Sequence, residues 1–214
     1  MSTQARSFRL VFLAAMLPLI LGACAVEDRT PSQEQLAMTG PQLVQKVCSQ
    51  CHGLTGESES PGFPKLAGQQ RAYLHLQLTD FKGHLRSDSA GTQYMWGFTH
   101  LSSRQIDELS DYFSAQQPMR SSEHGSHPRG ETIFRQGLPE LGVVQCAACH
   151  GERAEGRDDI PRLAGQHVQY LERQIAVFKH TDQRPRGAAM KAVTHALSDE
   201  DAQAVARYIA SLGA

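Results

Sequence analysis

The sequence is poor in the features that would link it to nucleic acid or to the interior of a membrane. Its formal net charge at pH 7 is −1, and it has no block of basic residues. Nucleic-acid-binding proteins need clustered positive charge, so this class has no support. Beyond residues 10–21 there is no apolar run close to the ~20 residues that a membrane-spanning helix requires. The function must therefore be sought in short motifs.

Cysteine is scarce, so each of the five residues carries information. Four of them form two copies of one pattern: Cys48-Ser49-Gln50-Cys51-His52 and Cys146-Ala147-Ala148-Cys149-His150. The Cys-x-x-Cys-His spacing is typical of c-type haem attachment. One helical turn presents two thiols to the two vinyl groups of a haem, and the next residue places an imidazole beneath the iron. The sequence thus predicts two covalently bound haems and leaves no cysteine pair for a disulfide.

Two other interpretations of the cysteine pairs must be weighed. An exported protein could use each pair as a thiol–disulfide redox centre, and the four thiols together could bind one zinc ion. Neither interpretation gives a role to the histidine that follows each pair. We therefore favour haem attachment, with His52 and His150 as the proximal iron ligands.

The N-terminal segment predicts export. Arg6 and Arg9 give a short positive region before the apolar residues 10–21. This run is too short for a mature transmembrane helix and is typical of a signal peptide. We expect residues 1–23 to be removed on maturation.

A lipid anchor is expected directly after this signal. Leu21-Gly22-Ala23-Cys24 resembles a bacterial lipobox, in which the cysteine becomes the lipidated first residue. Residues 24–37 would then form a polar tether that holds a periplasmic protein at a membrane, and Ala25 favours the outer membrane over the inner one. The alternative is an ordinary signal peptide with an incidental cysteine.

The remainder of the chain is a tandem repeat. Pro64-Lys65-Leu66-Ala67-Gly68-Gln69 returns as Pro161-Arg162-Leu163-Ala164-Gly165-Gln166, and shorter matches follow in the same order. The spacing between copies drifts by a few residues, which is typical of a duplicated domain with loop insertions. We expect a first domain at 38–117, a polar linker containing proline and glycine at 118–128, and a second domain at 129–214.

Apolar periodicity predicts that both copies are all-α, and no segment is typical of a long strand. In each copy one helix precedes the cysteine motif, one begins near a Tyr-Leu pair, and one follows Ser102 or Ser198, which suit an N-cap. The predicted helices lie, in chain order, at 41–47, 73–81, 102–113, 130–134, 170–178 and 198–212. Each copy is small, so a covalently held haem would supply much of its apolar interior.

Each iron needs a sixth ligand or remains open for chemistry. Met95 and Met190 align between the copies, each about forty residues after its haem histidine. Methionine is ordinarily a core filler, but two that align across a diverged duplication, in a glycine-containing loop region, are better explained as ligands. His100 and His195 also align and are the competing candidates. His75 and His167 have no counterpart in the other copy, and His84 and His180 align only with a one-residue shift; these four are expected to be solvated.

Two prolines have an expected role beside the haems. Pro64 and Pro161 follow the haem histidines by 12 and 11 residues. A proximal histidine donates its free ring N–H to a carbonyl, which fixes its orientation and raises its basicity. Because proline has a fixed φ, its carbonyl is well held. We expect these carbonyls to accept from the histidines, and Leu66 and Leu163 to pack on the haems.

Taken together, these motifs resemble the cytochrome c4 family of dihaem proteins. The resemblance covers roughly residues 38–214 and rests on both Cys-x-x-Cys-His-Gly runs, both Pro-x-Leu-Ala-Gly-Gln segments, the aligned methionines and the closing helices. It implies an all-α fold of two tandem cytochrome c-like domains, each wrapped around one haem with His/Met ligation. The first copy departs more from the family pattern, with Lys65 where the second has Arg162.

The resemblance also implies a function. Its members carry electrons one at a time between redox proteins, here from a donor such as a quinol:cytochrome c reductase towards a terminal oxidase. Six-coordinate iron binds no small-molecule substrate, so an electron carrier without catalytic residues is expected. Two alternatives remain open: a dihaem peroxidase with a five-coordinate haem, and a cytochrome subunit permanently bound to a dehydrogenase or oxidase.

Overall fold

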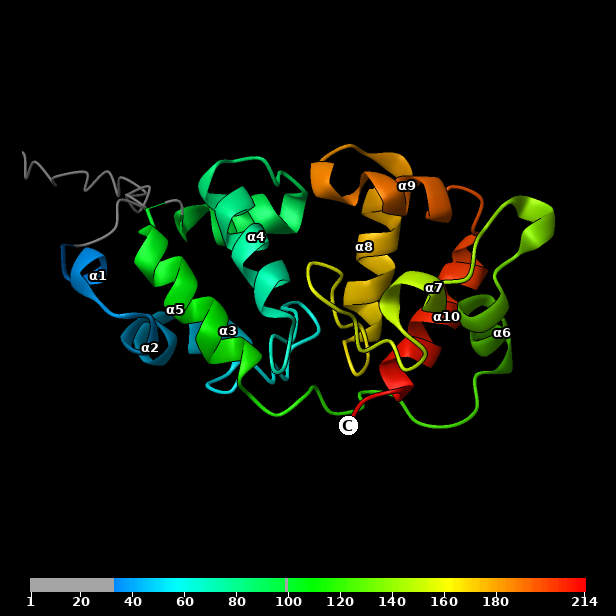
Figure 1. The fold of residues 1–214 in the computed structure, drawn as a ribbon, viewed down its shortest axis with the longest axis horizontal. Coiled ribbons are helices and arrows are strands. Elements are labelled where there is room, and N and C mark those ends of the chain that lie inside the picture. The colour runs from blue at the N-terminus through cyan, green and yellow to red at the C-terminus, as the bar shows by residue number, and fades with distance from the viewer. Residues whose placement is uncertain (1–32, 99) are drawn as a thin grey trace, which may run out of the picture.

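The structure, a computed structural model, describes residues 33–98 and 100–214. Figure 1 shows two helical domains side by side, joined by one extended connection along an edge of the molecule. The described ranges contain no β-strand, although two isolated bridges occur. The expected all-α architecture of two tandem domains is therefore confirmed. The predicted signal peptide at 1–23 and Cys24 lie outside the described residues.

The first domain carries its cysteine motif at the end of an unbroken helical segment. Its elements are, in chain order, α1 (Gln33–Ala37), α2 (Gly40–Leu43), η1 (Val44–Cys48), α3 (Ser49–His52), α4 (Arg71–Lys82), η2 (Gly91–Met95), η3 (Trp96–Phe98) and α5 (Ser103–Ser114). A π-helical turn, η1, joins α2 directly to α3. The helix α1 occupies the end of the segment predicted to be a tether, where Glu34 pairs with Lys46 at 2.7 Å.

The second domain repeats this plan with a break before its cysteine motif. Its elements are α6 (Pro128–Gln136), η4 (Pro139–Leu141), α7 (Ala147–His150), α8 (Val168–His180), η5 (Pro185–Gly187), α9 (Ala188–Thr194) and α10 (Asp199–Ser211). Gly137 directly follows helix α6; its φ is +73°, and a side chain there would clash with the Val143 carbonyl. Residues 138–145 therefore form a loop where the first domain has continuous helix.

The cores follow the apolar stripes predicted from the sequence. In the first domain α5 packs on α2 and α4, and in the second α10 packs on α6 and α8. The predicted N-caps are confirmed: Ser102 accepts from the Gln105 backbone N–H at 3.2 Å, and Ser198 accepts from that of Asp201 at 3.0 Å. These bonds satisfy backbone donors that the first turn of a helix leaves unpaired.

The segment predicted as a polar linker is more firmly packed than its composition suggested. Met119 is completely buried, and its carbonyl accepts from the Ala214 backbone N–H at 2.9 Å. Ser122 donates its backbone N–H to the Ala210 carbonyl at 3.2 Å. A single apolar residue gives no periodic signal, so the sequence could not show that this connection packs against the second domain.

The domains meet along α4 and α8, which face each other at the centre of Figure 1. Two arginines are buried there, Arg86 from the first domain and Arg184 from the second. Each guanidinium lies over a phenylalanine of its own domain and donates to Gln77 and Gln174, one glutamine from each domain. The boundary is thus a hydrogen-bonded polar contact with approximate two-fold symmetry.

Two further contacts across the boundary break this symmetry. Asp80 is 2% exposed, and both its carboxylate oxygens accept from Nε of Arg186 at 2.8 Å. His167 is 8% exposed, and its Nε2 donates to the Ser58 carbonyl at 2.9 Å. The prediction that His167 is solvated is wrong. This residue directly precedes α8 at the boundary between the domains. The sequence of one copy does not show where that boundary lies. His84 and His180 are exposed as predicted.

Candidate functional site

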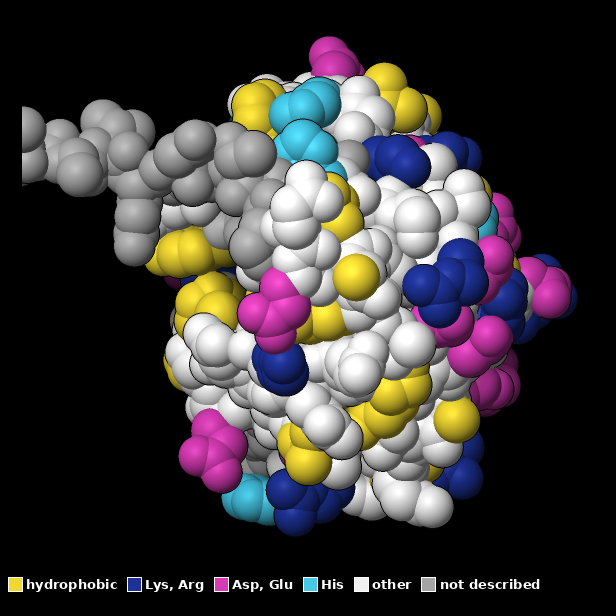
Figure 2. Space-filling model, turned by 90° about the vertical axis from the view of Figure 1, so that its left-hand side faces the viewer, with side chains coloured by type: hydrophobic (Ala, Val, Ile, Leu, Met, Phe, Trp, Pro, Cys, Tyr) yellow, Lys and Arg dark blue, Asp and Glu magenta, His cyan; other side chains and the backbone are white. Residues whose placement is uncertain are grey.

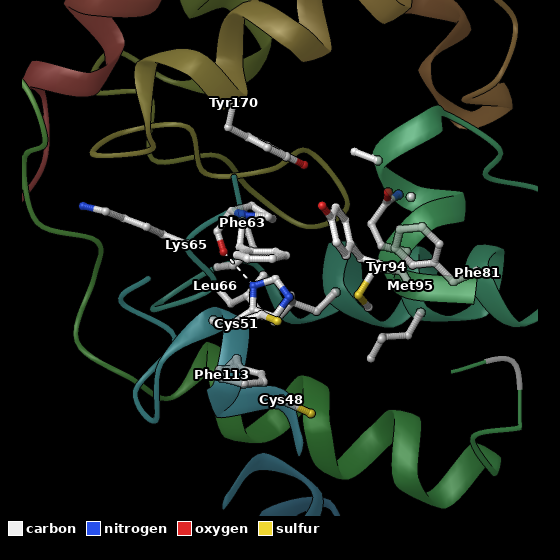
Figure 3. Close-up of a pocket in the computed structure, with 18 of the residues that line it drawn as sticks. Cys48, Cys51, Phe63, Lys65, Leu66, Phe81, Tyr94, Met95, Phe113 and Tyr170 are labelled. Atoms are coloured by element: carbon white, nitrogen blue, oxygen red, sulfur yellow. Dashed lines mark hydrogen bonds between the residues drawn. The ribbon is translucent and has the colours of Figure 1, made fainter. Parts of the chain in front are cut away.

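A largely apolar cavity brings together the residues predicted to hold the first haem. It is lined by Cys48, Cys51, His52 and Met95, which come from η1, α3 and η2. In Figure 3 Met95 reaches into the cavity from one side, and Cys51 lies on the other. Apolar side chains from the rest of the domain complete the lining: Leu43, Val47, Leu66, Leu74, Phe81, Phe98, Leu109 and Phe113.

The haem histidines make the hydrogen bonds predicted from the sequence. Nδ1 of His52 donates to the Pro64 carbonyl at 2.8 Å, and Nδ1 of His150 donates to the Pro161 carbonyl at 3.0 Å. Burial lowers the pKa of both imidazoles, and these hydrogen bonds oppose the shift only in part. Each ring is therefore neutral near pH 7 with its proton on Nδ1, which leaves the Nε2 lone pair free to bind a metal.

The two competing roles for the cysteine pairs fit the structure poorly. Burial raises the pKa of the Cys48 and Cys146 thiols to about 11, so both are protonated at pH 7 and are weak nucleophiles for disulfide exchange. A shared zinc site would need both pairs in one place, but they belong to different domains. Within residues 33–98 and 100–214, no three His, Cys, Asp or Glu side chains are grouped to hold a metal ion.

Both aligned methionines lie in short helical elements. Met95 ends η2 and Met190 lies in α9, whereas the sequence suggested loops. The competing candidates His100 and His195 are exposed, and Nδ1 of His195 is bonded to the Ala192 carbonyl at 2.6 Å. An exposed imidazole is badly placed to reach an iron in an apolar cavity. The methionines therefore remain the predicted sixth ligands.

The first cavity extends across the domain boundary, which the sequence did not predict. Seven residues of the second domain line it: Pro161, Arg162, Leu163, Gln166, Tyr170, Arg173 and Gln174. Leu66, which was predicted to pack on the haem, lines the cavity. Leu163 was expected to pack on the haem of its own domain, and it lines the first domain's cavity while packing on the second domain's core. The repeated Pro-x-Leu-Ala-Gly-Gln segment gave no local signal of these contacts, because its cross-domain partners lie about a hundred positions away.

The residues present fit a c-type haem. The macrocycle needs an apolar slot, its two vinyl groups need two thiols, and the iron needs a nitrogen lone pair. The first cavity supplies these through its apolar lining, Cys48 with Cys51, and His52. The carboxylates of a haem also need polar partners, and Gln69, Tyr73 and Arg86 line the cavity where it reaches the domain boundary.

Comparison with known sequences gives two matches to one family. The sequence model of the cytochrome c family matches residues 37–116 and again residues 128–213. Cytochrome c-552 of Acidithiobacillus ferridurans is 37% identical over 177 residues, which cover 80% of this chain and 76% of that protein. Cytochrome c4 of Azotobacter vinelandii is 33% identical over 177 residues, which cover 78% of this chain and 84% of that protein.

A solved structure shows the same fold over both domains. The crystal structure of reduced recombinant cytochrome c4 from Pseudomonas stutzeri matches with a TM-score of 0.72 and 32% sequence identity. The match covers 80% of this chain and 96% of that chain. Because nearly all of that chain is covered, the likeness extends to the two-domain arrangement. Two cytochrome c domains imply two c-type haems.

Removing one cysteine pair should remove one haem. In the variant Cys146→Ala/Cys149→Ala we expect the ratio of haem to protein, measured by the alkaline pyridine haemochrome assay, to fall from two to one. The same loss is expected for Cys48→Ala/Cys51→Ala, because each domain holds its own pair. Ser49→Ala is the control, since it alters the first motif without removing a thiol. A ratio that stays at two in either double variant would contradict the assignment.

Proposed function

Since this chain belongs to the cytochrome c4 family of dihaem electron carriers, we propose that it transfers electrons one at a time within a periplasmic respiratory chain, towards a terminal oxidase. The observation that supports this function best is the pair of buried histidines, each with Nδ1 held by a proline carbonyl and Nε2 directed to metal binding. The same arrangement occurs once in each domain, as two separate one-electron centres require.

We assign the axial ligands as His52 with Met95 and His150 with Met190. When bound, a c-type haem supplies a one-electron couple between Fe(II) and Fe(III). The chain's own residues hold that couple in place and set its potential. The histidines are 7% and 6% exposed, so the protein keeps water away from the proximal side. Methionine as the second ligand favours the reduced state compared with a second histidine, which suits a carrier near the oxidising end of a chain.

The surface supports brief encounters with redox partners. On the end face of the first domain, side chains of both charge signs are interspersed with small apolar patches (Figure 2). Both domains expose a few large apolar side chains, among them Leu54, Leu85 and Val144. Transient redox complexes bury little surface, less than ~1,200 Å² in total, so no large apolar interface is needed. We expect a donor such as a quinol:cytochrome c reductase and a terminal oxidase as acceptor.

Loss of one methionine should change one haem. In Met95→Ala we expect half of the methionine–iron charge-transfer absorption to disappear and one midpoint potential to fall by at least ~0.1 V, within the ~0.8 V range that axial ligands control. Met190→Ala should do the same to the other haem. Met38→Leu is the control, because Met38 is buried in the core of the first domain. If the double variant retains both the absorption and both potentials, the ligand assignment is wrong.

Electron delivery to an oxidase can be tested with membranes. Washed membranes from a strain that lacks the protein should consume oxygen slowly with ascorbate as reductant, and purified protein should restore the rate as a saturable function of its concentration. A steady-state peroxide turnover with a high-spin haem signal would favour the peroxidase alternative instead. Stoichiometric co-purification with a dehydrogenase or oxidase at high salt would favour a permanent subunit.

We further propose that the mature protein is held at a periplasmic membrane surface by a lipid on Cys24. The support is the sequence alone, an apolar run that ends in Leu-Gly-Ala-Cys. In the described part of the chain, no helix has the length and apolar character to span a bilayer. Cys24→Ala should move the haem-bearing protein from the membrane fraction to the soluble periplasmic fraction, followed by haem staining. Retention in the membrane fraction after a high-salt wash would contradict the anchor.

A further inference from the structure

The glutamine that ends each repeated Pro-x-Leu-Ala-Gly-Gln segment crosses to the other domain. Oε1 of Gln166 accepts from the Lys65 backbone N–H at 2.9 Å, and its Nε2 donates to the Lys65 carbonyl at 3.0 Å. Gln69 makes the mirror-image contact: its Oε1 accepts from the Arg162 backbone N–H at 2.7 Å, and its Nε2 donates to the Arg162 carbonyl at 2.9 Å. Each domain thus contributes one amide side chain that forms two hydrogen bonds with the backbone of the other domain.

In each domain, the residue that binds this glutamine directly follows the proline whose carbonyl accepts the hydrogen bond from the haem histidine. The Lys65 N–H and the Pro64 carbonyl belong to one planar peptide group. That group accepts from Nδ1 of His52 through its oxygen and donates to Gln166 through its nitrogen. In the second domain, the peptide between Pro161 and Arg162 likewise links His150 to Gln69.

Both glutamines of these links are shielded from water and fixed in orientation, and the link at Lys65 is buried throughout, whereas Arg162 is half-buried. The side chains of Gln166 and Gln69 are 3% and 5% exposed, and Lys65 is 5% exposed. Each Oε1 also accepts the backbone N–H of the following residue, at 3.0 Å from His167 and at 2.9 Å from Gln70. With little water to compete, such hydrogen bonds are electrostatically stronger than at a surface.

The hydrogen bonds from the glutamine through the proline peptide to the histidine should polarise one another in one direction. An acceptor on a peptide N–H polarises that amide and places more negative charge on its carbonyl oxygen, because hydrogen bonds in series strengthen one another. A stronger carbonyl acceptor draws the Nδ1 proton and makes the imidazole a better electron donor at Nε2. A more basic proximal ligand stabilises the oxidised, more positively charged form of the metal it binds.

We propose that Gln166 and Gln69 are cross-domain positioning residues, each of which lowers the reduction potential of the haem in the opposite domain through the shared proline peptide. This inference rests on the proposed function, in which His52 and His150 bind the two irons. The inference explains why the glutamine of each repeat binds the opposite domain. It also means that the reduction potential of each haem depends on the contact between the domains.

Replacement of Gln166 should therefore affect the first domain's haem although the substitution lies in the second domain. In Gln166→Leu we expect the reduction equilibrium constant of that haem to rise two- to fivefold, which is a midpoint shift of about +20 to +40 mV at 59 mV per tenfold change. The potential of the second haem should stay within error. Gln69→Leu should give the reciprocal result. Potentials are read by NMR-monitored redox titration, with the ligand methyl signals assigned through Met95→Ala.

Two variants separate this role from a general loosening of the interface. Gln166→Glu keeps an oxygen that can accept from the Lys65 N–H, so the first haem's potential should stay at or below that of the wild type. Arg186→Gln removes a cross-domain ion pair with Asp80 that touches neither proline peptide, and it should not raise the first haem's potential. Amide hydrogen exchange at Lys65 should quicken in Gln166→Leu and remain slow in Gln166→Glu.

The outcomes distinguish this inference from the proposed function. It is overturned if Gln166→Leu leaves both potentials unchanged, if it moves both equally, or if Gln166→Glu raises the first potential as Gln166→Leu does. If the methionine variants shift their potentials while the glutamine variants do not, the electron carrier stands and this inference fails. If neither set shifts anything, the ligand assignment itself has failed.

Discussion

A buried neutral imidazole has one proton to donate, and the site in each domain depends on where that proton goes. His52 and His150 each give it to a proline carbonyl, 12 and 11 residues further along the chain. The bond satisfies a donor that burial would otherwise leave unpaired at a cost of about 1–3 kcal/mol. It also fixes the tautomer and the ring orientation, and it leaves the Nε2 lone pair free to bind a metal. The helical turn, the cysteines and the proline loop are arranged around this one contact.

The same peptide groups also connect the two halves of the molecule. Gln166 and Gln69 reach across the boundary with paired hydrogen bonds that resemble those between neighbouring strands. Duplication explains why the contacts come in pairs, since the same sequence segment occurs once in each domain. It does not explain the asymmetric contacts, such as the ion pair between Asp80 and Arg186. Arg86 has Asp88 as a partner at 2.7 Å, whereas the hydrogen bonds of Arg184 go to uncharged groups in the described part of the chain. The two haem environments are therefore alike in plan and different in charge.

Much of the fold and the candidate site could be predicted from local sequence. Helix periodicity, the serine N-caps, the cysteine spacing and the histidine–proline pairs are determined by interactions within a few turns of chain, so residues read in order suffice. Features that depend on packing between distant segments were missed. Met119 is buried in contact with Ala214 and Gln166, and His167 in contact with the first domain; neither residue belongs to a periodic pattern. The methionine segments were expected to be loops because glycines obscured their short helices.

The sequence by itself indicated two haem-attachment motifs, one in each copy, because covalent attachment needs a fixed spacing of thiols and imidazole along one helical turn. It also determined an all-α chain, because the apolar residues recur with helical period. Only the tertiary structure decided how the units face each other, that second-domain residues line the first cavity, and that each repeated glutamine binds the opposite copy. Such contacts join residues about a hundred positions apart. No local pattern records them, because their partners are backbone groups, whose chemistry is the same at every position except proline.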